Sequence, residues 1–367
     1  MRTLHLMLAA VTASSLWSLP SYQVFGLGNL GGPATAYAIN NNGVVVGTSA
    51  NAQGDFRGFV WNGGSLIELA GIPGSFQLYA SGINNSGTIA GSADGSAVRW
   101  QNGVPSTIGQ GPGNAMAVND AGQVAGMQNG QAFRTVGGQV QYLGTVGGGS
   151  WAAAYGINAA GEVAGYGETA SGAMRGFVSQ NGQLQQIGTL GGSSSYALAI
   201  NDSKQVAGHA ARANGHLEAF LYYNGTMTAL GTLGGVASYA YGINRSGAVV
   251  GSSWLDDDDD DGGQAAFLYA DGQMRDLNAL ISPNSGWKLL AAYGINDIGQ
   301  IVGTGLYNGQ QMAVLLNPVA STSPASNFEP AAAGAAVPEP GTIALLAAGM
   351  AFLAFGRWRR NAAPPQE

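Results

Sequence analysis

The sequence YGINDIGQIVG at residues 293–303 is the last of seven copies of one pattern. In each copy a short apolar segment ends in Asn, a turn follows, and a second apolar segment ends in Gly. The seven Asn residues are Asn40, Asn84, Asn119, Asn158, Asn201, Asn244 and Asn296. Their spacing, about 43 residues on average, is typical of a propeller blade made of short strands. The repeat therefore predicts an all-β fold, a seven-bladed β-propeller of four-stranded blades.

The fifth unit shows how one blade is divided into strands. Its four segments are SYALAIN (195–201), QVAGHA (205–210), HLEAFLYY (216–223) and TMTALGTLGG (226–235). Asn224-Gly225, between the third and fourth segments, is a signal for a type I′ hairpin. The same order recurs in the other units, so we expect each blade to be a four-stranded antiparallel sheet.

Turn chemistry explains the repeated Asn. Its side chain can bond the backbone two residues on, and Gly in the fourth place of N-x-x-G takes a left-handed conformation. Lys204 replaces that Gly in the fifth copy, so we expect a positive φ at Lys204. The alternative is that the seven Asn side chains surround a ligand in the channel. The residue two before each Asn is always Ala or Gly, as expected where innermost strands converge on an axis.

The first and last segments of the repeat region are expected to form one blade together. The last unit contains only three strand segments, and the chain begins with YQVFGLGNLGG (22–32). This segment resembles the fourth segments of other units, such as ALGTLGG (229–235). We therefore expect the N-terminal segment to complete the last blade, which closes the ring and removes strand edges that would promote aggregation.

The bulk composition narrows the classes of partner. Charged residues make up 9% of the 367 residues, and the formal net charge is -7. An ordinary soluble domain contains about 25% charged residues. Lys204 and Lys288 are the only lysines, so the chain has no basic stripe to neutralise the phosphates of a nucleic acid. The absence of Cys excludes disulfides and thiolate chemistry.

The N-terminus is predicted to be a secretory signal peptide. Arg2 precedes an apolar run from Leu4 to Val11, and small residues follow from Thr12 to Ser15. The alternative for this stretch is a disordered segment or a core strand.

The C-terminus combines a short motif, an apolar span and a basic cluster. VPEPGT (337–342) precedes IALLAAGMAFLAF (343–355), which predicts a single hydrophobic helix. The helix is a little short for a hydrocarbon core of about 30 Å. Arg357, Arg359 and Arg360 follow it and are expected to act as a membrane stop on the cytoplasmic side. A terminal core helix is the alternative.

This order of features resembles the PEP-CTERM sorting signal of Gram-negative bacteria, with Pro338, Glu339 and Pro340 as its motif. The resemblance implies transient insertion in the inner membrane and cleavage near the motif by an exosortase, a membrane cysteine protease. It also implies export to the periplasm, the outer surface or the extracellular matrix, in a setting of polysaccharide and biofilm formation. The expected order of domains is a signal peptide (1–21), the propeller (22–317), a disordered Ala/Ser/Pro linker (318–336), the sorting signal with its membrane helix (337–360) and a cytoplasmic tail (361–367).

The repeats are similar to those of the HAF family of extracellular repeats. The similarity rests on EAFLYY, which contains Ala219 and Phe220, and on ALGTLGG, which ends at Gly235. It covers residues 27–316 and implies an extracellular repeat protein, but no particular activity.

The acidic run at residues 256–261 is a candidate calcium site. Asp257, Asp259 and Asp261 have the spacing of the start of a calcium loop, but Leu268 stands where the completing carboxylate is expected. A solvated loop is the alternative. His209, His216 and Glu218 lie close together in the sequence and are candidate ligands of a zinc site. The alternative is that they are ordinary surface polar residues that bind no metal.

The sequence shows no catalytic set and implies no cofactor apart from weakly bound Ca²⁺. We therefore expect a non-enzymatic exported protein whose loops on one propeller face mediate adhesion or bind polysaccharide of a biofilm matrix. A propeller-fold glycan lyase or hydrolase is the alternative, and it would require acid, base and Arg groups that converge at the channel mouth. A calcium-dependent structural matrix protein is a third hypothesis.

Overall fold

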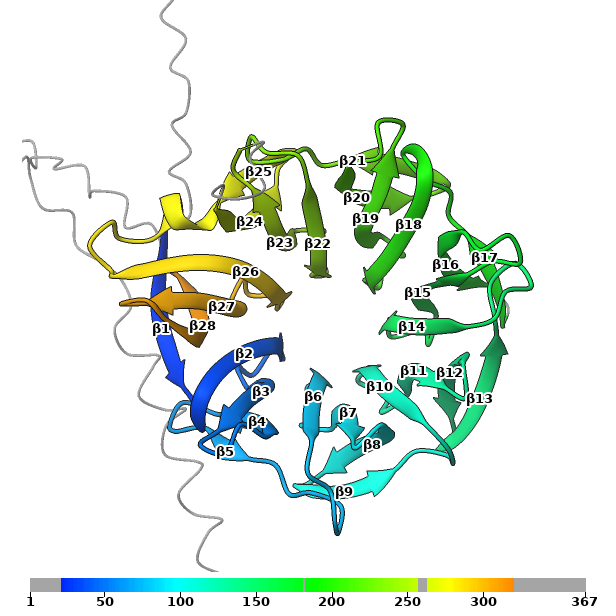
Figure 1. The fold of residues 1–367 in the computed structure, drawn as a ribbon, viewed down its shortest axis with the longest axis horizontal. Helices are drawn as coiled ribbons and strands as arrows, with labels where there is room; N and C mark the ends of the chain where they lie inside the picture. The colour runs from blue at the N-terminus through cyan, green and yellow to red at the C-terminus, as the bar shows by residue number, and fades with distance from the viewer. Residues whose placement is uncertain (1–20, 181, 257–262, 320–367) are drawn as a thin grey trace, which may run out of the picture. The chain divides into compact units, whose positions relative to one another are not determined.

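The computed structural model describes residues 21–180, 182–256 and 263–319. Its strands form seven four-stranded sheets, arranged as blades around a central axis (Figure 1). The predicted seven-bladed β-propeller is confirmed. Residues 1–20 of the predicted signal peptide, residues 320–336 of the predicted linker, and the predicted C-terminal helix lie outside the described residues, as do Asp257, Asp259 and Asp261. The remaining residues of the first two predicted segments belong to strands, Ser21 to β1 (Ser21–Gly28) and residues 318–319 to β28 (Gln310–Val319). None of the helices within the described ranges is long and apolar enough to cross a membrane.

Each blade contains four strands, counted here outward from the channel. The innermost strands are β2 (Gly31–Ile39), β6 (Leu78–Ile83), β10 (Gly113–Val118), β14 (Ala152–Ile157), β18 (Gly191–Ile200), β22 (Ser238–Ile243) and β26 (Trp287–Ile295). The second strands are β3 (Val45–Asn51), β7 (Ile89–Ala93), β11 (Val124–Gln128), β15 (Val163–Glu168), β19 (Val206–Arg212), β23 (Val249–Trp254) and β27 (Ile301–Tyr307). The third strands are β4 (Phe56–Trp61), β8 (Ser96–Gln101), β12 (Gln131–Val136), β16 (Met174–Gln180), β20 (Leu217–Tyr223), β24 (Gln264–Ala270) and β28 (Gln310–Val319). The outermost strands are β5 (Ile67–Glu68), β9 (Val104–Thr107), β13 (Gln139–Gly144), β17 (Gln183–Gln186), β21 (Thr226–Ala229), β25 (Gln273–Asp276) and β1 (Ser21–Gly28). A short 3-10 helix, η1 (Leu277–Leu280), follows β25.

The repeated turn joins the innermost strand to the second strand in every blade. In all seven copies the Asn side-chain oxygen accepts a hydrogen bond from the backbone N–H four residues on, as from Val44 to Asn40 at 2.9 Å. The fourth residue of the turn has a positive φ in every copy, including Lys204 at 63°. The predicted turn and the predicted positive φ of Lys204 are both confirmed. The predicted side-chain bond to the backbone two residues on is found, among these described turns, at Asn40 and Asn201.

Replacing Lys204 by Gly is expected to relieve backbone strain of about 0.5–1 kcal/mol. Lys204 Nζ also lies 2.7 Å from Glu162 Oε1 of the neighbouring blade, and an exposed ion pair contributes about 0–1 kcal/mol. We therefore expect Lys204→Gly to be close to neutral alone and stabilising when Glu162 is first replaced by Gln. Urea unfolding of the four proteins measures both effects, and destabilisation by Lys204→Gly in the Glu162→Gln background would contradict the strain argument.

The N-terminal strand closes the ring. β1 pairs antiparallel with β28, with Ser21 opposite Val319 and Phe25 opposite Leu315. The last blade therefore has the strand order β1-β28-β27-β26, and Figure 1 shows β1 in blue beside β28 in orange. The predicted closure by the N-terminal segment is confirmed.

One predicted boundary is wrong. The Leu-Gly-Gly end of the predicted fourth segments does not belong to an outermost strand, because β1 ends at Gly28 and β17 ends at Gln186. Gly31 and Gly191 already begin the innermost strands of the following blades. Both have a positive φ, 124° and 98°, and a Cβ on Gly31 would lie 2.7 Å from the backbone nitrogen of Ala52. The glycines are therefore needed where the chain crosses between blades.

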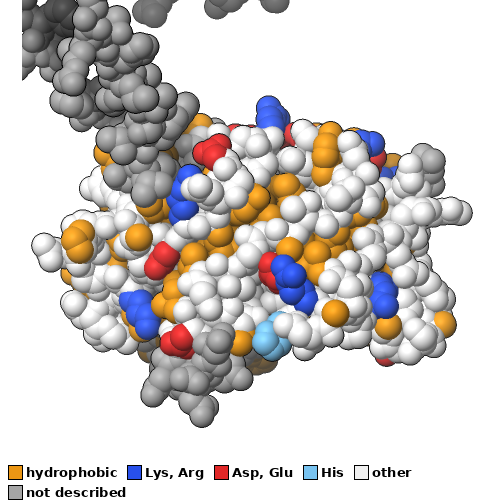
Figure 2. Space-filling model, turned by 90° about the horizontal axis from the view of Figure 1, so that it is seen from above, with side chains coloured by type: hydrophobic (Ala, Val, Ile, Leu, Met, Phe, Trp, Pro, Cys, Tyr) orange, Lys and Arg blue, Asp and Glu red, His pale blue; other side chains and the backbone are white. Residues whose placement is uncertain are grey.

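The core is distributed among the blades. An aromatic side chain of the third strand is fully buried in six blades: Phe59, Trp100, Phe133, Phe177, Phe220 and Phe267. In five blades the Gly that ends the repeat makes room for this ring, since a Cβ there would lie 2.7–3.0 Å from a ring atom. These residues are Gly47, Gly91, Gly165, Gly208 and Gly251. Seen from the side, the ring shows few and scattered charged side chains, with hydrophobic side chains between them (Figure 2).

Candidate functional site

Every innermost strand contains a β-bulge at the same place. Its pairing with the second strand skips the residue three before the repeated Asn, as between Ala36 and Ala38 in β2. A bulge leaves its extra residue unpaired and redirects its side chain. The seven skipped residues all line one cavity in the channel, and they are Tyr37, Ser81, Met116, Tyr155, Leu198, Tyr241 and Tyr293.

This space, called here the tyrosine cavity, has a volume of about 670 Å³. Small-molecule sites commonly have volumes of about 300–1,000 Å³. Tyr79, Ser92, Gly95 and Asn114 complete its lining. The lining residues thus offer aromatic faces, hydroxyls and one amide, and none of these residues carries a charged side chain.

The tyrosine rings are held by contacts with one another. Tyr293 lies between Tyr37 and Tyr241, with ring centroids 5.4 Å and 5.0 Å away. Tyr155 stacks on Tyr166 at 4.8 Å, and their hydroxyl oxygens are 2.9 Å apart. Aromatic pairs of this kind have preferred geometries, so the cavity presents its rings in fixed orientations.

Burial keeps the cavity phenols protonated. It raises the pKa of Tyr293 to about 12, with further contributions from Tyr241 and Tyr37. Burial also raises the pKa values of Tyr37, Tyr155 and Tyr241. At neutral pH these side chains are therefore uncharged and can both donate and accept hydrogen bonds.

A further run of rings links three neighbouring blades. His209 lies between Tyr196 and Tyr239, with ring centroids 4.8 Å and 5.0 Å away, and Tyr196 contacts Tyr166 at 5.0 Å. Burial lowers the pKa of His209 to about 4, so its imidazole is neutral at neutral pH. Its Nδ1 atom is buried without a hydrogen-bond partner among the described residues.

The zinc candidates do not form a metal site. His209 belongs to the aromatic run, whereas Glu218 accepts hydrogen bonds from Arg212 and from the backbone N–H of Gly231. Within residues 21–180, 182–256 and 263–319, no group of three or more His, Cys, Asp or Glu side chains is placed to bind a metal ion. The calcium candidates Asp257, Asp259 and Asp261 fall outside these ranges.

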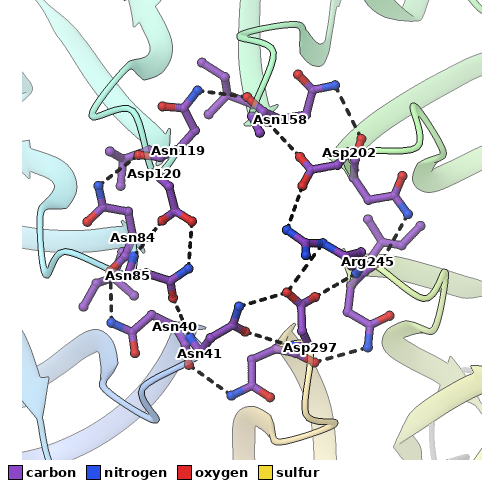
Figure 3. A pocket seen from close by; sticks show the side chains of 18 of the residues that line it. Asn40, Asn41, Asn84, Asn85, Asn119, Asp120, Asn158, Asp202, Arg245 and Asp297 are labelled. Atoms are coloured by element: carbon purple, nitrogen blue, oxygen red, sulfur yellow. Dashed lines mark hydrogen bonds and ion pairs between the residues drawn. The ribbon is translucent and has the colours of Figure 1, made fainter.

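The other end of the channel is surrounded by a ring of hydrogen bonds. Each repeated Asn donates from Nδ2 to the backbone oxygen of the repeated Asn in the next blade, at 2.9–3.4 Å. The last bond, from Asn296 to Asn40, joins the seventh blade to the first (Figure 3). We call these seven residues the asparagine ring. Their side chains are used between blades and within turns, which explains them without a ligand.

The residues directly after the asparagine ring form the mouth at this end. They are Asn41, Asn85, Asp120, Ala159, Asp202, Arg245 and Asp297. Asp202 Oδ1 accepts a hydrogen bond from the backbone of Ala159 at 2.8 Å, and Asp202 Oδ2 lies 3.3 Å from Arg245 Nη2. Asp297 Oδ1 accepts from the backbone of Arg245 at 2.9 Å (Figure 3). Acidic and Arg groups thus do converge at a channel mouth, where their contacts fasten adjacent blades, around a space of about 200 Å³.

The tyrosine cavity was not predicted from the sequence. A signal was present, because Tyr stands three residues before the repeated Asn in four of the seven copies. The signal was missed because a bulge at this position, which turns the side chain toward the axis, cannot be recognised from the pattern of apolar residues.

Two known sequence families match parts of the chain. Residues 150–337 match the family described as "Protein of unknown function (DUF3466)", and residues 336–360 match the PEP-CTERM protein-sorting motif. The resemblance to the PEP-CTERM signal at Pro338, Glu339 and Pro340 is thereby confirmed, and the chain is an exported protein of the kind that exosortase sorts. The roles of Arg357, Arg359 and Arg360 stay predictions. No curated protein matches the chain.

Several solved structures share the propeller fold. A puromycin-hydrolyzing peptidase of Mycobacterium tuberculosis has a TM-score of 0.51 at 12% identity, covering 78% of this chain and 51% of its own. The extracellular domain of the putative hybrid two component system BT4673 from B. thetaiotaomicron has a TM-score of 0.51 at 10% identity, covering 80% of this chain and 40% of its own. YCF48 bound to D1 peptide has a TM-score of 0.50 at 11% identity, covering 83% of this chain and 98% of its own. This chain spans about half the length of the peptidase, and at these identities the likeness shows the fold alone.

Proposed function

The chain belongs to the DUF3466 family of proteins of unknown function, so we propose its function from the geometry of its own site. The protein binds extracellular polysaccharide in the tyrosine cavity and does not cleave it. The observation that carries this proposal is the convergence of the seven bulged residues on one uncharged cavity. The sorting motif supports an extracellular setting, as does the resemblance of the repeats to the HAF family. Binding of this kind would attach the exported protein to the polysaccharide of a biofilm matrix.

The chemistry of the cavity suits a sugar ring. A pyranose has flat faces of C–H groups and a rim of hydroxyls, so it needs both apolar contact and hydrogen bonds. Tyr supplies a large apolar ring with a polar tip. Tyr37, Tyr241 and Tyr293 offer three such groups side by side, and Ser81 and Asn114 add smaller polar groups.

The lack of charge in the lining favours neutral sugars over uronic acids. A carboxylate moved into the tyrosine cavity would lose its hydration without gaining a cationic partner among the lining residues. Burial of an unpaired charge is costly. The proposed ligand is therefore a neutral polysaccharide.

Binding is expected to be independent of pH between about pH 5 and about pH 9. The phenol of Tyr293 has a raised pKa of about 12, so it stays protonated until the pH rises well above this window. His209 has a lowered pKa of about 4, so it stays neutral until the pH falls below the window. Calorimetric titration at both limits measures the dissociation constant, and a change of tenfold or about 1.4 kcal/mol would point to a charged site.

The proposal is tested with matrix polysaccharide from the exosortase-positive host, separated by anion exchange into neutral and acidic fractions. The purified protein is expected to be retained by the immobilised neutral fraction. Tyr293→Ala is expected to weaken retention, whereas Tyr223→Ala, which removes a 45% exposed ring at the end of β20, is expected to leave it unchanged. Equal unfolding midpoints show that the variants are folded. Retention that survives Tyr293→Ala, or that occurs on the acidic fraction alone, contradicts the proposal.

Glycan cleavage is a second candidate function, favoured by the convergence of Asp202, Arg245 and Asp297 at the other channel mouth. Against it, these carboxylates are already bonded to adjacent blades, and the space of about 200 Å³ is below the volume of common ligand sites. We expect no release of new reducing or unsaturated ends from either fraction. Release that Asp202→Asn abolishes would identify an enzyme and refute the non-enzymatic proposal.

A further inference from the structure

Two exposed phenylalanines belong to segments that contact residues next to the tyrosine cavity. Phe56 begins β4 and is 45% exposed, and Phe76 lies between β5 and β6 and is 67% exposed. The ring of Phe56 is 5.8 Å from that of Tyr79, which lines the cavity. Exposed apolar side chains that gather in one region often mark a contact surface.

Hydrogen bonds fix the backbone that carries these two rings. Asp94 accepts from the backbone N–H groups of Phe76 at 2.9 Å and Gln77 at 2.8 Å. The side chain of Gln77 in turn accepts from the backbone N–H of Phe56 at 3.0 Å. Asp94 directly precedes Gly95, which lines the cavity. The two phenylalanines are therefore anchored, through Asp94 and Gln77, to the wall of the cavity.

Phe at the start of a third strand occurs in one of the seven blades. The third strands of the other six blades begin with Ser96, Gln131, Met174, Leu217, Gln264 and Gln310 instead of Phe. The charged neighbours of Phe56 are engaged with one another, since Arg57 lies 3.5 Å from Glu68 and 3.9 Å from Asp55. Among the third strands, the one in the first blade is thus alone in beginning with an aromatic side chain.

We propose that Tyr79, Phe56 and Phe76 form a track along which a neutral polysaccharide chain continues outward from the tyrosine cavity. The inference rests on the proposed function and deepens it: the ligand is a run of several consecutive sugars, with one part in the cavity and the next part across these rings. Continuity with the cavity favours this occupant over a protein partner. Stacking of successive sugars on successive rings would make the affinity depend on chain length.

The test compares disaccharides with octasaccharides prepared by partial hydrolysis of the neutral matrix polysaccharide. Octasaccharides are expected to bind more tightly than disaccharides. Phe56→Ala and Phe76→Ala are each expected to weaken octasaccharide binding about two- to tenfold, the contribution of a single aromatic contact, and to leave disaccharide binding unchanged. Tyr293→Ala is expected to weaken both, and Tyr223→Ala neither. Since Phe56 and Phe76 are exposed, their substitution is expected to leave the unfolding midpoint unchanged.

The outcomes separate the track from the cavity. If neither Phe56→Ala nor Phe76→Ala weakens octasaccharide binding, the proposed track is wrong. The effect of Tyr293→Ala then still decides whether the cavity binds sugar. Failure of the unchanged protein to bind either oligosaccharide overturns both proposals. Sedimentation without ligand provides the third readout: a dimer that Phe76→Ala dissociates would show that the rings bind a second copy of the chain, which also overturns the track.

Discussion

Deletion of residues 21–28 is expected to abolish the soluble monomeric propeller. The deletion removes β1, and with it the buried side chains of Tyr22 and Leu27, each of which contributes about 1.5–3 kcal/mol by burial. It also leaves β28 as an unpaired edge strand, and such edges promote aggregation. Since a folded domain is stable by only about 5–15 kcal/mol, the combined loss is large. Size-exclusion chromatography and urea unfolding measure the result.

A permuted chain provides the control for this deletion. Residues 21–28 are moved behind Val319 and joined to it by an Asn-Gly turn, like the turn at Asn224 and Gly225, whose φ values are 49° and 81°. Because β1 is antiparallel to β28, the permuted segment is expected to form a hairpin and restore the monomer. A deletion variant that stays monomeric with an unchanged midpoint would contradict closure of the ring by β1.

Asn84→Asp is expected to destabilise the propeller by about 2–4 kcal/mol at pH 7, within the range for a lost buried donor and an unpaired buried charge. Asn84 is 4% exposed. Its Nδ2 donates to the backbone oxygen of Asn119 at 2.9 Å, and its Oδ1 accepts from Thr88 N–H at 2.8 Å. The substitution keeps the acceptor of the turn but replaces the donor of the asparagine ring by a carboxylate oxygen that repels the Asn119 carbonyl.

This destabilisation is expected to be smaller at pH 4 than at pH 7. Burial raises the pKa of a carboxyl group, so the folded state favours the protonated acid, whose hydroxyl can donate to Asn119. Stability is then lost as the pH rises from the unfolded pKa of about 3.9 toward the raised folded value. Asn102→Asp, at an exposed hairpin position with φ 51°, is the matched control and is expected to be neutral. Equal effects of the two substitutions would contradict the asparagine ring.

The fold was predictable because each blade repeats the same local requirements. A positive φ in the fourth place of the turn selects Gly at Gly43, Gly87 and their equivalents. Close approach of innermost strands selects Ala or Gly two residues before the Asn, since a Cβ on Gly242 would lie 2.8 Å from the backbone oxygen of Tyr293. Local rules of this kind can be recognised in a sequence that contains seven copies of them.

The asparagine ring was not predicted, although its signal was in the sequence. Asp and Ser also form turns of this kind, yet all seven copies contain Asn. An amide supplies a donor as well as an acceptor, and the donor serves the next blade, as from Asn40 to the backbone of Asn84. Turn chemistry accounts for the oxygen of the amide. The bond made by its nitrogen depends on a residue about 43 positions away in the sequence, in the next blade.

The tyrosine cavity was less predictable than the fold because it is built from the positions that vary. The residue three before the Asn is Tyr, Ser, Met or Leu. One such residue in one blade does not indicate a binding site. Only closure of the ring brings Tyr37 from the first blade beside Tyr293 from the last. The track likewise depends on Phe56, which begins β4 of the first blade, and on Phe76 in the segment between the first and second blades. Periodicity predicts neither side chain.

The location of the protein in a biofilm-forming, exosortase-positive culture tests the central claim most directly. Mass spectrometry and immunoblotting compare the matrix and the medium for the unchanged protein and for a Tyr155→Ala/Tyr293→Ala variant shown to be folded. We predict that the unchanged protein lies in the matrix and lacks residues 343–367, and that the variant is processed in the same way but is released into the medium. Matrix protein with an intact C-terminus would contradict sorting by exosortase, and a variant that remains in the matrix would contradict attachment through the tyrosine cavity.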